Sequence, residues 1–131
     1  MKLNVGMLGY AFMGKTHSNA LRQMPRFFYP PPATPVLKCI CGRNESPVKN
    51  AKNQLGWEEY TTDWKDLINR DDIDVFINCG PNNVHKEPVI AAAEAGKHII
   101  CEKPLAMNAK DAQDMHDAVS KAGVKAMVAF N

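Results

Sequence analysis

The sequence predicts an α/β fold in which a mostly parallel, six-stranded sheet lies between two layers of helices. Short apolar runs alternate with stretches of helical periodicity, and Gly or Pro separates most of them. Strands that alternate with helices form right-handed crossovers, which place the strands parallel to one another. With 131 residues, 45% hydrophobic and 23% charged, the chain has the length and composition of one globular domain.

Each element has its own local signal. Strands are expected at residues 3–8, 36–41, 59–61, 73–79, 97–101 and 125–130, and helices at 14–24, 46–56, 64–69, 85–95 and 109–122. Ser46, Asp63 and Asn108 are the expected N-caps. Pro25 is expected to stop the first helix, and the proline-rich residues 25–35 to form a loop with three aromatic residues, part of which packs on the protein body.

Composition excludes several classes of protein. No apolar run reaches the roughly 20 residues of a membrane span, and no secretory signal opens the chain, so we expect a cytoplasmic protein without membrane contact. The four cysteines have no Cys-x-x-Cys spacing and are expected as buried free thiols rather than zinc ligands or disulfides. Residues 1–56 hold eight Lys and Arg against one acid, which suggests an anionic ligand; without a basic run or aromatic stripe, nucleic acid is not expected.

A glycine-rich turn follows the first strand. It reads Gly9-Tyr10-Ala11-Phe12-Met13-Gly14, one residue away from the pattern Gly-x-Gly-x-x-Gly. Gly9 allows a tight turn, a small residue at Ala11 lets the backbone approach a pyrophosphate, and Gly14 lets the helix pack against the sheet. The turn therefore predicts a dinucleotide site at a helix N-terminus, with a purely structural turn as the alternative.

The end of the second strand bears on which dinucleotide is bound. NAD sites usually place an acid here, but this chain has Gly42, Arg43 and Asn44. A guanidinium beside a small residue can hold a 2′-phosphate, so NADP is favoured over NAD. Alternatively, Arg43 stacks on adenine and tolerates either cofactor.

Two later loops are expected at the same edge of the sheet, since ligands bind outside the carboxyl ends of parallel strands. The first holds Cys79, Gly80, Pro81, Asn83 and His85. We expect this loop to lie beside the cofactor. Alternatively, Asn83 could cap the next helix, and His85 could be a capping or packing residue.

The second loop is Glu102-Lys103-Pro104, after the fifth strand. A lysine at this position can hydrogen-bond a substrate hydroxyl and help to move its proton. Pro104 shapes the turn and could follow a cis peptide bond. The alternative is that Lys103 forms a surface ion pair with Glu102.

Taken together, these segments resemble the Gfo/Idh/MocA oxidoreductase family, which includes glucose-fructose oxidoreductase and inositol dehydrogenase. The resemblance spans the chain and rests on the glycine turn with His17 after it, Asp63-Trp64, Pro81-Asn82-x-x-His85, the run 95–98, Cys101 to Leu105, and the closing residues 128–131. The chain departs from the family at Ala11, where a glycine is usual, and at Gly80, where a threonine is often found.

The resemblance implies a three-layer Rossmann domain over residues 1–131 that binds NADP or NAD. It also implies that Lys103 is catalytic, that Glu102 fixes it, and that the substrate is a sugar or polyol. Family members continue into an α+β substrate domain that this sequence does not contain, so we expect this chain alone to be inactive and any homo-oligomer to form through that domain.

Two other functions remain open. Related two-domain proteins reduce cyclic imines or linear tetrapyrroles with similar cofactor domains. A Rossmann module can also sense a nucleotide without chemistry, although Lys103 argues against this.

Overall fold

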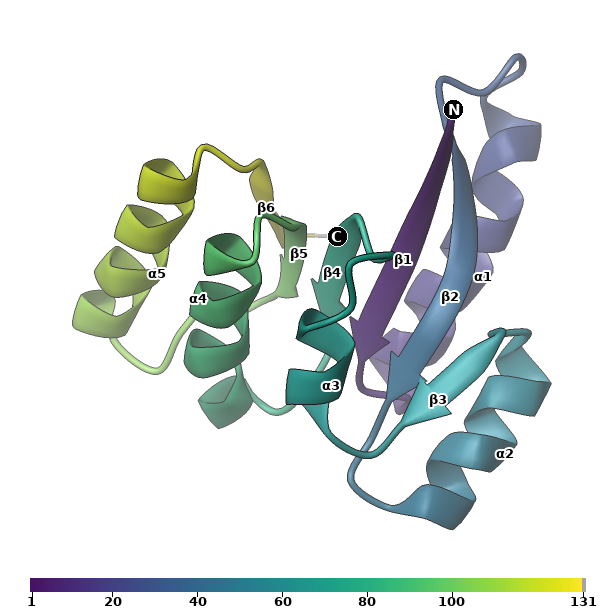
Figure 1. Ribbon diagram of the computed structural model, residues 1–131, viewed down its shortest axis with the longest axis horizontal. Coiled ribbons are helices and arrows are strands. Elements are labelled where there is room, and N and C mark those ends of the chain that lie inside the picture. The colour runs from purple at the N-terminus through teal and green to yellow at the C-terminus, as the bar shows by residue number, and fades with distance from the viewer. Residues whose placement is uncertain (131) are drawn as a thin grey trace.

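Six strands form one parallel sheet in the computed structural model, which describes residues 1–130 (Figure 1). The strand order is β3-β2-β1-β4-β5-β6. The strands are β1 (Lys2–Leu8), β2 (Thr34–Cys41), β3 (Glu59–Thr61), β4 (Val75–Asn78), β5 (His98–Glu102) and β6 (Ala126–Ala129). The helices are α1 (Phe12–Phe27), α2 (Glu45–Leu55), α3 (Trp64–Ile68), the 3-10 turn η1 (Asn82–Val84), α4 (Lys86–Glu94) and α5 (Ala109–Ala122). The predicted α/β fold is confirmed; Asn131, the last of the closing residues 128–131 in the family resemblance, lies outside the described residues.

Each face of the sheet has its own core. Helices α1 and α2 cover one face of the sheet over strands β1 to β3. Met7, Ile40 and Val48 are completely buried in this core. Helices α3, α4 and α5 cover the other face around Phe76 and Leu67, both likewise fully buried. Parallel sheets require such cover on both faces, because their strands are apolar on both sides.

The region around Pro25 corrects one expectation and refines another. Helix α1 continues through Pro25 to Phe27, and the Phe28 N–H still donates to the Met24 carbonyl at 3.0 Å. Proline removes a single N–H donor, and in the last turn of a helix this loss does not end it. The aromatic residues are not the part of this segment that packs on the body, since Phe27, Phe28 and Tyr29 are 79%, 60% and 89% exposed.

Two of the three expected N-caps are confirmed. The side chains of Asp63 and Asn108 accept hydrogen bonds from the Lys65 and Asp111 N–H groups at 2.8 and 2.9 Å. The third is wrong, because α2 begins at Glu45 with Asn44 before it. Pro47 is therefore the third helical residue, still within the turn where helix N–H groups lack partners.

The cysteines are free, as predicted. Cys39, Cys41 and Cys101 are buried in strands, and Cys79 is half-buried just after β4. Burial raises the pKa of the Cys39 thiol to about 11 and those of the other three to about 12. All four thiols are therefore protonated at neutral pH. None of the helices within residues 1–130 has the length and apolarity needed to cross a membrane.

Candidate functional site

Four loops meet at the carboxyl edge of the sheet, because β1, β2, β4 and β5 all run in one direction. The strand order reverses between β1 and β4, since the chain builds outward first on one side of β1 and then on the other. Crevices at such switch points bind ligands in open α/β sheets. The loops here are 9–11, 42–44, 79–81 and 103–108, so the structure brings all the predicted site segments to one edge.

The glycine turn is a tightly packed junction. Gly9 has a φ of +101°, and a Cβ there would lie 2.5 Å from the Cys79 carbonyl oxygen. Its N–H donates to the Cys41 carbonyl at 2.9 Å, which ties the turn to the end of β2. A Cβ at Gly14 would collide with the Gly9 carbonyl oxygen, so both glycines are required by close backbone approach.

Helix α1 presents its N-terminus at this edge. Ala11 is its N-cap residue, and among residues 1–130 no side chain accepts a capping bond there and no acid lies in the first turn. The unpaired N–H groups and the helix dipole can therefore receive an anion. This arrangement fits the pyrophosphate of a dinucleotide. Phe12, the first helical residue, is 76% exposed beside it.

The loop after β2 lies directly against this turn. The Tyr10 ring occupies the space that a Cβ at Gly42 would fill, so only glycine allows this contact. Arg43 and Asn44 are exposed at the start of α2. The next residue, Glu45, is an acid. It accepts a hydrogen bond from the Tyr60 hydroxyl at 3.2 Å.

Buried polar side chains shape the loop after β4. Asn78, fully buried, accepts from the Gly80 N–H and donates to the Val84 carbonyl, both at 3.0 Å. This residue was missed in the sequence analysis, which offered no signal beyond a polar residue closing an apolar strand. Pro81 begins the exposed stretch in which η1 lies. Helix α4 has His85 at its N-cap position, so Asn83 does not cap it.

His85 connects this loop to the next one. Its ring is fully buried, with Nε2 3.0 Å from the Gly80 carbonyl oxygen. Nδ1 lies 2.9 Å from the Pro104 carbonyl oxygen and 3.2 Å from that of Leu105. Both nitrogens lie within hydrogen-bond distance of backbone oxygens, an arrangement that fits the packing role named as an alternative in the sequence analysis.

The lysine loop begins with a buried acid. Glu102, the last residue of β5, is 5% exposed. Its Oε1 lies 2.7 Å from His17 Nε2, and its Oε2 accepts from the Lys103 N–H at 3.3 Å. Lys103 is exposed, and the peptide bond before Pro104 is cis.

The surface ion pair considered for Lys103 does not form. Glu102 pairs with His17 instead, and over the described part of the chain the Lys103 ammonium has no carboxylate within ion-pair distance. Lys103 is therefore free to meet a ligand at the edge of the sheet. Residues 1–130 contain no cluster of three His, Cys, Asp or Glu side chains that could hold a metal ion.

The family model of the oxidoreductases with an NAD-binding Rossmann fold (GFO_IDH_MocA) matches residues 3–130. The chain belongs to this family. Levoglucosan dehydrogenase of Pseudarthrobacter phenanthrenivorans is 50% identical over 129 residues, which are 98% of this chain and 33% of that protein. Myo-inositol 2-dehydrogenase of Thermotoga maritima is 31% identical over 129 residues, 98% of this chain and 36% of that protein.

Solved structures agree with these matches. A levoglucosan dehydrogenase in complex with NADH and levoglucosan superposes with a TM-score of 0.97 at 48% identity, over 99% of this chain and 35% of that one. The chain spans about a third of the length of the relatives it matches. It corresponds to the NAD-binding domain of these sugar and polyol dehydrogenases.

Proposed function

We propose that this chain is the cofactor-binding part of an NAD(P)-dependent oxidoreductase that transfers a hydride to or from a sugar or polyol. The observation that carries the proposal is the placement of an uncapped helix N-terminus and a free lysine at one switch-point edge. The first suits a pyrophosphate, and the second suits the oxygen of a reacting alcohol or ketone. The sugar and polyol dehydrogenases among the relatives support this substrate class.

Each part of the edge has a role in this proposal. The backbone of residues 9–14 binds the pyrophosphate, and the loops 42–44 and 79–81 flank the cofactor, which supplies a hydride donor or acceptor when bound. Lys103 donates a hydrogen bond from Nζ to the substrate oxygen and stabilises the charge that develops there. Glu102 and Pro104 fix the turn from which this lysine projects.

The cofactor preference follows from the end of β2. We propose that Arg43 binds a 2′-phosphate, which makes NADP the favoured cofactor. Arg43 is exposed at the edge, and the Tyr10 ring packs against Gly42 beside it. The Tyr60 hydroxyl in β3 donates a hydrogen bond to Glu45, which follows this loop at the start of α2.

Calorimetric titration of NADH and NADPH into the chain tests the binding site, with A11D and A11G as matched variants. An aspartate at position 11 is a good N-cap, so it should preserve folding while it occupies the free N–H groups and repels phosphate. We expect A11D to lose about 100-fold in affinity, equivalent to about 2.7 kcal/mol, with an unchanged melting temperature. A11G should bind like the wild type.

The outcomes separate the proposal from its alternatives. Equal binding by A11D and the wild type would place the pyrophosphate elsewhere, and an absence of heat with either cofactor would overturn the binding proposal. A third outcome concerns a complete enzyme that contains this chain. If that enzyme bound the cofactor but its K103A variant kept full turnover, this edge would bind the cofactor without a catalytic role for Lys103.

A further inference from the structure

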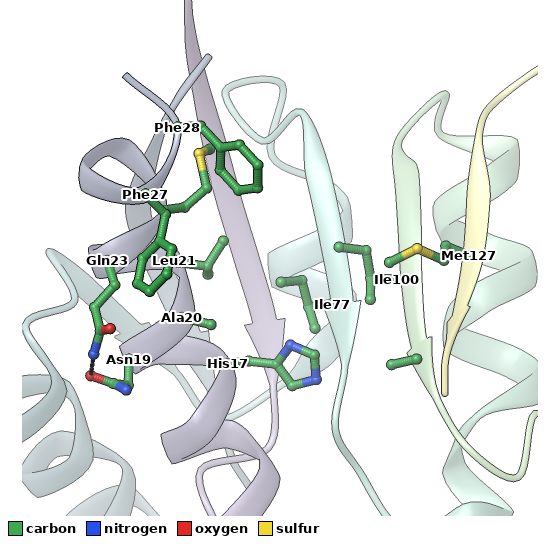
Figure 2. Close-up of a pocket in the computed structure, with 12 residues that line it drawn as sticks. His17, Asn19, Ala20, Leu21, Gln23, Phe27, Phe28, Ile77, Ile100 and Met127 are labelled. Carbon is green, nitrogen blue, oxygen red and sulfur yellow. Dashed lines mark hydrogen bonds between the residues drawn. The ribbon is translucent and has the colours of Figure 1, made fainter. Parts of the chain in front are cut away.

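The side chain of His17 reaches from the helix of the glycine turn to the strand of the lysine loop. It extends from α1 toward the sheet, as Figure 2 shows, and its Nε2 lies 2.7 Å from Glu102 Oε1 at the end of β5. The two residues are 85 positions apart in the sequence. Their side chains are only 15% and 7% exposed.

The Glu102 carboxylate requires such a partner. A carboxylate this deeply buried is costly unless both oxygens find donors. Oε2 accepts from the Lys103 N–H, and Oε1 accepts from His17. The thiols of Cys79 and Cys101 lie close enough to interact electrostatically with Glu102, and their pKa values of about 12 keep them neutral.

The His17–Glu102 pair therefore joins two halves of the site. Helix α1 begins at the glycine turn, and His17 lies in its second turn. Glu102 bonds the backbone of the residue that follows it, which is Lys103. A rigid link between α1 and this backbone sets the distance between the phosphate cradle and the lysine.

We propose that His17 is a positioning residue that acts through Glu102 to fix Lys103 relative to the glycine turn. The catalytic meaning of this rests on the proposed function, but the ordering itself does not. When His17 is lost, Oε1 has no donor, the carboxylate turns toward water, and the Lys103 N–H loses its acceptor.

Backbone ¹⁵N relaxation of Lys103 tests the proposal on the chain without cofactor. We expect an order parameter near 0.85 in the wild type and below about 0.6 in H17A and H17N, the latter having an amide too short to reach Glu102. In H17Q the longer amide places an N–H near the position of Nε2, so the order of Lys103 should return. H116Q removes an exposed histidine and should change nothing.

The Met7 amide in the buried strand β1 is the internal reference. Lys103 remaining ordered in H17A or H17N would overturn the proposal, as would failure of H17Q to restore order in a folded protein with a normal Met7 signal. If H17A does not fold, H17N and H17Q decide.

A second measurement separates this proposal from the proposed function. With saturating NADH, nuclear Overhauser contacts between the nicotinamide ring and the Lys103 side chain report where the lysine lies. Their absence in the wild type would overturn the role of Lys103 in hydride transfer, whereas the relaxation result would still decide the role of His17.

Discussion

The two halves of the sheet end in different kinds of loop. After β1 and β2, the edge is built from backbone and small residues, with Gly9, Gly14 and Gly42 each at a close approach. After β4 and β5, it is built from buried polar side chains, of which Asn78, His85 and Glu102 hold the loops through hydrogen bonds.

The difference matches what each half has to do. A phosphate is bound by N–H groups, and any side chain between them and the ligand is an obstacle. A reacting oxygen needs a side chain held at a fixed place, which requires supporting residues beneath it. Substitutions should therefore act through steric conflict in the first half and through unpaired polar groups in the second.

The largest effect is expected at Gly9. Replacement by alanine forces a side chain into a φ of +101° with its Cβ 2.5 Å from a backbone oxygen. Urea unfolding of G9A should show a loss of about 3 kcal/mol or more. G96A is the matched control, since Gly96 also has a positive φ, +74°, but nothing lies within 4 Å of its Cβ position; it should lose about 1 kcal/mol. Equal losses would mean that the crowding at Gly9 relaxes freely.

The second half should respond next most strongly at His85. H85A removes a buried ring that packs between the two loops, and the backbone carbonyl that accepts the ring N–H loses its donor. We expect unfolding free energy to fall by about 2–3 kcal/mol. H116A, at an exposed helix position, should stay within about 0.5 kcal/mol of the wild type. A small loss in H85A would show that other contacts hold the two loops together.

The same contrast explains how much of the site could be predicted from sequence. Glycine spacing and apolar periodicity act over a few residues, so the order of strands and helices and the tight turn at Gly9 were predicted correctly. The pair of His17 and Glu102 joins residues 85 positions apart, and no local pattern encodes it. In the same way, the hydrogen bonds of Asn78 become visible only when the loop is folded around them.

The error at Pro25 has the opposite origin. A local rule predicted that the helix ends at residue 24, before Pro25, but the helix continues to Phe27 and the Phe28 N–H donates to the Met24 carbonyl. Sequence rules place the ends of helices least accurately, because a single backbone hydrogen bond there decides whether the helix continues.

A smaller effect is expected on cofactor preference at Arg43. R43D removes the guanidinium and adds the acid that usually holds a ribose 2′-hydroxyl. The ratio of NADPH to NADH affinity, measured by calorimetry, should fall by about tenfold or more. E45Q is the control for the neighbouring acid and should leave the ratio within about twofold. An unchanged ratio in R43D would assign Arg43 to stacking on adenine.

The smallest effect is expected from the buried thiols, which both halves of the sheet contain. Cys41 in β2 and Cys101 in β5 are both buried thiols whose pKa is raised from 9.0 to about 12. Above pH 9 the unfolded chain releases these protons while the folded chain keeps them, so stability falls as pH rises from 9 toward 12. The loss is at most about 1.4 kcal/mol per pH unit for each thiol.

Urea unfolding at pH 8 and pH 10 measures how much unfolding free energy is lost as the pH rises. In C41A and in C101A this loss should be about 1 kcal/mol smaller than in the wild type. Equal reductions would show that the strand interiors of the two halves are alike, which would confine their difference to the loops. If only one variant changed the loss, the halves would differ in their cores as well, and steric and polar effects could not be assigned to the loops alone.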